Sequence, residues 1–220
     1  MTNRLAIFDC DGTLVDSAAN ICVAMEQCFA AAQLPLPPRH LTRRVVGLSL
    51  VEAVATLHPE GEPDLHLAMA EDYKRAFQVL RAQGMVVEPL FDGITKTIDK
   101  LDHAGWLLGV ATGKSDRGLA FCLEHHGLAD RFVTLQTADR HPSKPHPSMI
   151  ETAMAEAGAE PATTVMIGDT SFDIGMAKAA GVLAIGVAWG YHDRAELLAE
   201  GADLVAEHPS DLVAMLEALK

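Results

Sequence analysis

The chain has 220 residues, which suits one large domain or a domain that carries a sizeable insertion. Hydrophobic residues make up 49% and charged residues 21% of the chain, a composition that excludes an intrinsically disordered protein. The formal net charge of −13 argues against DNA or RNA as the main partner, because nucleic-acid binding begins with a basic surface. An acidic chain is compatible with a site that gathers carboxylates around a divalent cation.

The first predicted strand covers residues 4–9, because this run is short, apolar and continuous and is followed by the turn signal Asp11-Gly12. Asp16 or Ser17 then begins a predicted helix that extends to about residue 33, where a proline-rich stretch ends it. Residues 41–83 keep a helical pattern and contain no run typical of a strand.

After Gly84, short apolar runs alternate with helical patterns. The predicted strands are 106–111, 132–136, 164–168, 182–187 and 203–206, and the predicted helices are 117–126, 147–157, 172–180, 194–199 and 210–219. Such alternation predicts a doubly wound, Rossmann-like α/β fold in which helices cover both faces of a parallel sheet. The helical stretch after the first strand, about 70 residues, is too long for a loop. We therefore expect an α/β core at residues 1–15 and 86–220 and an inserted helical domain at 16–85.

The sequence shows no signal peptide, membrane span or cysteine-based zinc pattern. No apolar run reaches the roughly 18 residues that a membrane span needs, and Asp9 and Asp11 interrupt the early apolar run that a signal peptide would require. The four cysteines include no C-x-x-C pair, so we expect buried thiols in a reducing compartment. We expect the ten histidines at the surface or at helix ends, and Trp189 and Tyr191 at a site rim or an interface. The expected location is the cytoplasm, with no membrane partner.

Chemically active side chains follow four of the predicted strands, at the edge where open α/β sheets bind ligands. The four loops contain Asp9-Cys10-Asp11-Gly12-Thr13, Thr112-Gly113-Lys114, Ser143-Lys144-Pro145, and Gly168-Asp169-Thr170 with Asp173 one turn further on. Crowded carboxylates repel each other unless a cation is present, and oxygen ligands without histidine or cysteine favour Mg²⁺. One carboxylate can attack phosphorus while a second serves as acid and base. The set suits phosphoryl transfer through an aspartyl-phosphate, with Thr112, backbone N–H groups and Lys144 holding the phosphoryl oxygens.

The ordered motifs Asp9-x-Asp11-Gly12-Thr13-Leu14, Thr112, Lys144 and Gly168-Asp169-x-x-x-Asp173 resemble those of the haloacid dehalogenase (HAD) superfamily. The resemblance covers essentially the whole chain and implies that residues 16–85 are a type I cap. It implies that Asp9 is the nucleophile and a Mg²⁺ ligand, and that Asp169 is a further ligand. Asp11 would be the acid and base and would offer its backbone carbonyl to the metal. Thr112, Gly113 and Lys144 would bind the phosphoryl group, and Asp173 would support the metal site from behind.

Local residues separate the activities known in this superfamily. Asp11 argues against a dehalogenase, because a leaving halide needs no proton, and Gly168 argues against a β-phosphoglucomutase-like phosphomutase, in which Glu precedes the aspartate. Gly168-Asp169-Thr170 is similar to phosphoglycolate-phosphatase-like hydrolases, so the resemblance implies hydrolysis of a small phosphomonoester, with phosphoglycolate as the first substrate to consider. Thr112-Gly113-Lys114 departs from the Thr-Asn-Lys of many such enzymes and leaves the exact substrate open. A phosphomutase, a pyrophosphate or nucleotide phosphohydrolase and a non-catalytic binding protein remain alternatives.

The segment Arg43-Arg44-Val45-Val46-Gly47-Leu48-Ser49 corresponds to the substrate-specificity loop that the resemblance implies. Arg43 or Arg44 could meet a substrate carboxylate or a second phosphate, or both could be ordinary solvated arginines. Gly47 permits close approach of the backbone to a ligand. The expected partner is a small-molecule phosphomonoester, and the expected oligomeric state is a monomer or a homodimer.

Overall fold

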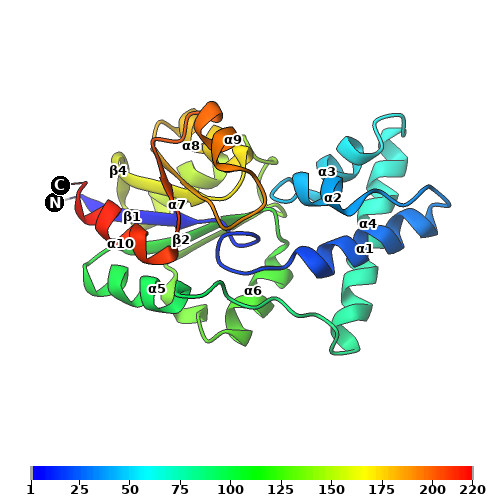
Figure 1. The fold of residues 1–220 in the computed structure, drawn as a ribbon, viewed down its shortest axis with the longest axis horizontal. Coiled ribbons are helices and arrows are strands. Elements are labelled where there is room, and N and C mark those ends of the chain that lie inside the picture. The colour runs from blue at the N-terminus through cyan, green and yellow to red at the C-terminus, as the bar shows by residue number, and fades with distance from the viewer. Residues whose placement is uncertain (1, 220) are drawn as a thin grey trace.

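A parallel sheet lies at the centre of the larger part of the molecule in the computed structural model, which describes residues 2–219 (Figure 1). Its six strands are β1 (Asn3–Phe8), β2 (Leu107–Thr112), β3 (Thr134–Thr137), β4 (Ala159–Gly168), β5 (Leu183–Val187) and β6 (Leu204–Ala206). They lie in the order β3-β2-β1-β4-β5-β6, and every pair of neighbours is parallel. The winding of the chain reverses beside β1, and ligands of open α/β sheets bind outside the strand ends at such a point.

Helices cover both faces of the sheet. One layer contains α5 (Ile94–His103), α6 (Asp116–His125) and α10 (Pro209–Glu217), and the other contains α7 (Ser148–Ala157), α8 (Ser171–Ala180) and α9 (Arg194–Glu200). Alternate residues of a buried strand point to opposite faces, so Ala6 and Phe8 pack toward the first layer, and Leu5 and Ile7 toward the second. Figure 1 shows the layers below and above β1. The predicted doubly wound α/β fold is confirmed.

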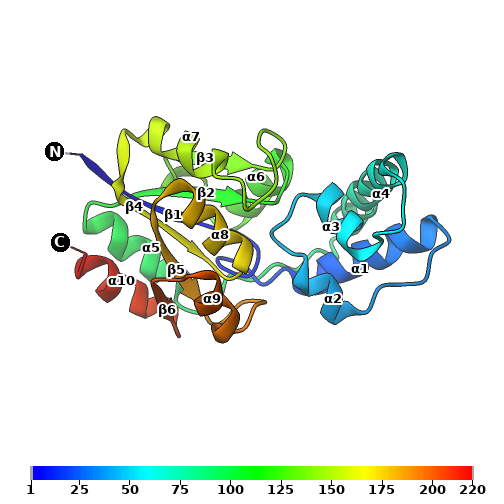
Figure 2. The same ribbon diagram turned by 90° about the horizontal axis from the view of Figure 1, so that it is seen from above.

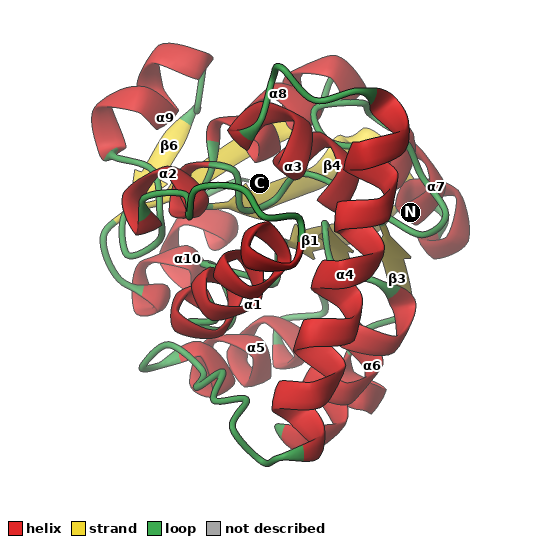
Figure 3. Cartoon of the chain, turned by 90° about the vertical axis from the view of Figure 1, so that its right-hand side faces the viewer, coloured by secondary structure: helices red, strands yellow, loops and turns green. Residues whose placement is uncertain are grey.

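A second group of helices lies beyond the carboxyl edge of the sheet (Figures 2 and 3). It contains α1 (Ala18–Ala31), α2 (Arg39–Arg44), α3 (Leu50–Leu57) and α4 (Pro63–Ala82), and we call these helices and their loops the helical insert. The helices pack around an apolar cluster of their own, which includes Met25, Phe29, Val54 and Met69. The insert therefore has its own core and faces the strand ends at which the predicted site residues lie.

Two adjacent chain segments join the helical insert to the sheet. The Asp16 N–H donates to the Pro89 carbonyl at 2.9 Å, and the Phe91 N–H donates to the Leu14 carbonyl at 3.0 Å. The chain leaves the core and returns to it along paired backbone segments. The connection lies immediately after the residues that follow β1, so the insert is attached beside that loop.

Helix α5 is not predicted by our reading of the sequence, although Ile94, Thr97, Ile98 and Leu101 are buried along one side at helical spacing. Its N-cap is Gly93, which has a φ of 90° and offers no side-chain cap, so the usual start signal is missing. The helical pattern of residues 41–83 resolves into α2, α3 and α4. All the strands and helices that were predicted after Gly84 are present, with bounds that differ by a few residues, and α5 is an additional helix.

The burial of the cysteines agrees with the sequence prediction, whereas the burial of two histidines does not. All four cysteines are buried and free, as predicted. Two histidines, His66 and His192, are buried rather than exposed. Across residues 2–219, no helix combines the length and the apolar character that crossing a membrane demands.

Candidate active site

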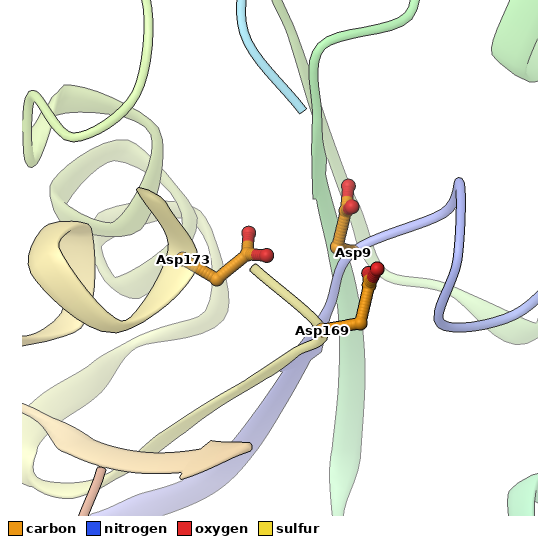
Figure 4. Close-up of side chains that lie close together, drawn as sticks. All are labelled: Asp9, Asp169 and Asp173. Carbon is orange, nitrogen blue, oxygen red and sulfur yellow. The ribbon is translucent and has the colours of Figure 1, made fainter. Parts of the chain in front are cut away.

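Three buried carboxylates meet at the carboxyl ends of β1 and β4 (Figure 4). Asp9 directly follows β1, Asp169 directly follows β4, and Asp173 lies in the first turn of α8. One oxygen of each lies within 4.8 Å of the others, and none of the three residues is exposed to solvent. Figure 4 shows Asp9 and Asp169 close together, with Asp173 reaching toward them from α8. The fold thus brings together aspartates that are about 160 positions apart in the chain.

Hydrogen bonds fix the orientation of Asp169. The Thr13 hydroxyl donates to Asp169 Oδ1 at 2.8 Å, and the backbone N–H of Tyr191 donates to Oδ2 at 2.9 Å. The Trp189 indole N–H in turn donates to the Thr13 carbonyl at 3.1 Å. Trp189 and Tyr191 therefore belong to the loop that holds this aspartate.

Two glycines make room for Asp169. A Cβ at Gly12 would lie 2.2 Å from Asp169 Oδ2, and a Cβ at Gly190 would lie 2.1 Å from Asp169 Cβ. Gly12 also has a φ of 85°, a conformation that other residues rarely adopt. The packing around the carboxylate therefore excludes a side chain at both positions.

Lys144 supplies the positive charge inside this cluster. Its side chain is fully buried, and Nζ lies 2.9 Å from Asp9 Oδ1 and 2.6 Å from Asp173 Oδ1. The other oxygen of Asp173 accepts hydrogen bonds from the Thr170 N–H and hydroxyl, at 3.0 and 2.7 Å. Because protein donors engage both of its oxygens, Asp173 holds Lys144 beside Asp9 rather than offering a free ligand atom.

The donor set fits a hard divalent cation. Both oxygens of Asp9 are buried and neither accepts a well-formed hydrogen bond, although Lys144 lies close to one of them. Burial raises the pKa of Asp9 to about 7; Lys144 opposes this shift, and Asp173 and Asp11 add to it. Burial likewise raises the pKa of Asp169 well above its ordinary value, with Asp9 and Asp173 contributing. Three carboxyl groups share one ammonium, and an oxygen-preferring cation such as Mg²⁺ would stabilise their ionised forms.

The carboxylate of Asp11 contacts different partners from that of Asp9. Lys114 Nζ lies 2.8 Å from Asp11 Oδ1 and 2.7 Å from Glu88 Oε1, and the three side chains are at most 9% exposed. Burial lowers the pKa of Lys114, but Asp11 and Glu88 outweigh it and hold the pKa well above its ordinary value. The Ser17 hydroxyl donates to the same Asp11 oxygen instead of capping α1. The sequence predicts Ser17 only as a candidate helix cap, and it predicts no contact of Asp11 with Lys114, Glu88 or Ser17. The place of Lys114 directly after Thr112-Gly113 is the one available signal.

Thr112 is the last residue of β2, and Gly113 follows it where the core contacts the helical insert. The Thr112 hydroxyl oxygen accepts from the Lys114 N–H at 3.2 Å, which leaves its own proton available for a ligand. A Cβ at Gly113 would lie 2.6 Å from the Leu48 carbonyl oxygen and 2.8 Å from that of Gly47. The absence of a side chain at Gly113 therefore lets the insert backbone contact the core directly.

The predicted specificity loop makes further contacts with the core. The Ser49 N–H donates to the Ser143 hydroxyl at 2.8 Å, and Arg44 forms an ion pair of 2.6 Å with Glu196. His192 lies with Nε2 3.2 Å from the Arg44 carbonyl, and burial lowers its pKa. A neutral His192 can donate this hydrogen bond, so the loop is held to the core at several points.

A cavity of about 230 Å³ lies between the helical insert and the core. On the core side it is lined by Asp11, Gly113 and Lys114, and on the insert side Gly47 is part of its wall. Arg43 and Arg44 do not line it; both are exposed, and the Arg44 guanidinium is engaged by Glu196. The cavity thus reaches the predicted acid and base, with the predicted specificity glycine at its wall.

Comparisons with known proteins agree with this arrangement. A model of the family described as "Haloacid dehalogenase-like hydrolase" matches residues 6–187. The chain is 38% identical over 221 residues to "Probable phosphatase IndB" of Dickeya dadantii (strain 3937), which covers 98% of this chain and 94% of that protein. It is 29% identical over 218 residues to "Phosphoglycolate phosphatase" of Vibrio vulnificus (strain CMCP6), with coverage of 96% and 94%.

A solved structure shows the same architecture. The crystal structure of a predicted phosphatase from Clostridium acetobutylicum is similar with a TM-score of 0.87 at 26% identity. The similarity covers 99% of this chain and 100% of that chain. It therefore includes the helical insert as well as the sheet.

Replacement of Lys144 tests the charge balance of the buried cluster. Lys144→Met is expected to lower the free energy of unfolding by about 3–5 kcal/mol in metal-free buffer, because it leaves buried carboxylates without a counter-charge. Lys178→Met is the control: Lys178 lies 2.7 Å from Asp203, but the side chains are 39% and 40% exposed. For such an exposed pair the loss is expected to be below about 1 kcal/mol. Urea denaturation measures both, and equal losses would contradict the assigned role of Lys144.

Proposed function

The chain belongs to the haloacid dehalogenase-like hydrolases, and we propose that it is a Mg²⁺-dependent phosphatase that hydrolyses a small phosphomonoester through an aspartyl-phosphate on Asp9. One observation carries this proposal. The Asp9 carboxylate is buried beside Lys144 with no well-formed hydrogen bond to either oxygen, while Asp11 contacts a separate set of partners. Two nearby carboxylates in different environments suit a nucleophile and an acid–base group.

The cation would be held by Asp9, Asp169 and the backbone carbonyl of Asp11. Asp169 is already oriented by Thr13 and the Tyr191 N–H, so its carboxylate is preorganised for a ligand role. When bound, Mg²⁺ would offset the charge of the carboxylates and of the phosphoryl oxygens. Asp173 would act through Lys144, which it holds in place.

In the proposed first step, an Asp9 oxygen attacks phosphorus and the bond between phosphorus and the ester oxygen breaks. Asp11 gives its proton to the leaving oxygen, and Lys144, the Thr112 hydroxyl and the Gly113 N–H contact the phosphoryl oxygens. In the second step, Asp11 takes a proton from water, which attacks phosphorus and releases Asp9 and inorganic phosphate. Lys114 and Ser17 keep Asp11 in position during both steps.

We propose that the helical insert, with boundaries at residues 16–85, is a cap over a core of residues 1–15 and 86–220. Its contacts through Arg44, Ser49 and the Gly47 and Leu48 carbonyls support a role in covering the phosphoryl group and excluding water. Gly47, with a φ of 99°, lies against Thr170, where an added Cβ would be 3.3 Å from the hydroxyl oxygen. Arg44 holds the insert to the core through Glu196.

Gly168 favours a phosphatase over a phosphomutase. A Cβ at this position would lie 2.3 Å from Asp173 Cγ, so the glutamate that a β-phosphoglucomutase-like enzyme carries there would displace Asp173 and with it Lys144. Phosphoglycolate is the first compound to assay, because relatives at 29% identity carry that name. Analysis of the reaction products would identify a pyrophosphate or nucleotide phosphohydrolase.

The proposed activity is tested by phosphate release from small phosphomonoesters. We expect release with Mg²⁺, none with a chelator, and recovery when Mg²⁺ is restored. Asp9→Asn is expected to reduce release to background, because an amide is not a nucleophile toward phosphorus. Asp16→Asn, the same change at an exposed carboxylate, is the control and is expected to keep full activity. Substantial activity of the Asp9→Asn variant, or phosphate release that is unchanged by the chelator, would contradict the mechanism.

Gly113→Ala tests the closed arrangement of the insert. The added methyl would meet the Leu48 carbonyl oxygen at 2.6 Å and push the insert away from the core. We expect KM to rise by about tenfold or more, because substrate positioning depends on closure, while the free energy of unfolding changes by less than about 1 kcal/mol. Steady-state kinetics and urea denaturation measure the two effects. Unchanged kinetics would show that the contact plays no part in turnover.

A further inference from the structure

The cavity between insert and core lies where the alcohol part of a substrate must sit. It is lined by Asp11, which would protonate the leaving oxygen, and by Gly113 beside the phosphoryl site, but not by Asp9 or Asp169. A phosphoryl group at Asp9 would therefore extend its ester oxygen past Asp11 into this space. The chemistry of the cavity walls then decides which alcohols fit.

The walls supplied by the insert are mainly apolar. The apolar side chains that line the cavity come from α1, from the loop after α2, from α3 and from α4; they are Ile21, Met25, Val45, Val46, Leu48, Leu50, Ala53 and Phe77. Val45 and Val46 are buried although neither belongs to the apolar cluster at the centre of the insert. Their side chains are thus available to pack against a ligand.

Two buried donors without partners line the cavity and are available to a ligand. Thr42 lines it, is completely buried, and its hydroxyl makes no hydrogen bond. Arg81 also lines it; its guanidinium stacks on the rings of Phe121 and Phe77, at 4.4 and 5.4 Å, and its buried Nε has no partner. Unsatisfied buried donors lower stability, so proteins retain few without a reason such as a ligand.

Given the phosphatase activity proposed above, we propose that the substrate is a phosphomonoester of an alcohol that is larger than glycolate and mainly apolar, such as an arylalkyl alcohol. The apolar part packs against Val45, Val46 and Phe77, and an acceptor group on it meets Thr42 or Arg81. The cavity of about 230 Å³ is far larger than a two-carbon acid requires, since one water takes up about 30 Å³ in the liquid.

Glycolate and sugars fit these walls poorly. Lys114, the lining cation that contacts Asp11, is already paired with Asp11 and Glu88. A glycolate carboxylate would have to reach Lys74, Arg81 or Arg117, which also line the cavity. A sugar would bury several hydroxyl groups against apolar side chains, which is unfavourable unless each finds a partner. An apolar alcohol instead gains from every methylene that leaves water.

The test compares unactivated esters of primary alcohols, so that leaving-group chemistry stays similar. The substrates are 2-phenylethyl phosphate, glycerol 3-phosphate and phosphoglycolate. We expect kcat/KM for 2-phenylethyl phosphate to exceed both others by about tenfold or more. A preference for phosphoglycolate or glycerol 3-phosphate would overturn the inference while leaving the phosphatase activity intact.

An isosteric substitution in the cavity lining tests whether the cavity causes the preference for an apolar ester. Val46→Thr replaces a methyl by a hydroxyl at a residue that is 6% exposed, and Val79→Thr makes the same change at a residue of α4 that is 51% exposed and does not line the cavity. We expect Val46→Thr to lower the selectivity for 2-phenylethyl over glycerol phosphate roughly fivefold, and Val79→Thr to leave it unchanged. Equal selectivity in the two variants would overturn the assignment.

A binding measurement separates failure of this inference from failure of the proposed function. Asp9→Asn protein with Mg²⁺ is titrated calorimetrically with 2-phenylethyl phosphate and with glycerol 3-phosphate. Tighter binding of the aryl ester supports the apolar subsite even if the wild-type protein releases no phosphate, whereas equal or weaker binding overturns it even if phosphate release is rapid.

Discussion

The burial of three carboxylates with a single ammonium at the end of β1 is the constraint on which the rest of the structure depends. Asp9, Asp169 and Asp173 are fully removed from solvent, and only Lys144 opposes their charge within the cluster that the described residues form. Such an arrangement is costly without further compensation. The surrounding loops use backbone donors and hydroxyls to hold Asp169 and Asp173, whereas neither Asp9 oxygen accepts a well-formed hydrogen bond. A bound cation would offset the remaining imbalance.

Asp11 has different contacts from Asp9, and these contacts connect the proposed acid–base group to the helical insert. Asp11 is tied through Lys114 to Glu88, which lies on the segment that returns from the insert to the core. The insert loop in turn packs its backbone on Gly113, directly before Lys114. The Asp11 carboxylate, which is proposed to transfer the proton, is thus held by core residues that lie next to the helical insert. Closure of the insert would then assemble the acid–base apparatus and the apolar subsite in one movement.

The sequence was sufficient to predict the parallel sheet, the insert and the joining of distant aspartates, because strand ends in such a sheet share one edge. Helix α5 was not predicted because its N-cap residue, Gly93, has no side chain that would signal the start of a helix. The surroundings of Asp11 could not be foreseen, since Glu88 and Ser17 carry no motif. Ser17 donates to Asp11 directly, and Glu88 is linked to Asp11 only through Lys114. The apolar cavity depends likewise on how four helices pack, which periodicity does not determine.

Formation of a phosphoryl–Asp9 bond is the central claim, and trapping it is the most direct test. The Asp11→Asn variant is mixed with 4-nitrophenyl phosphate and Mg²⁺, quenched in acid and digested for mass spectrometry. This ester needs no proton on its leaving group, whereas hydrolysis of the intermediate needs Asp11. The account predicts a peptide that carries one phosphoryl group on Asp9. Release of nitrophenol over many turnovers with no phosphorylated peptide would contradict it.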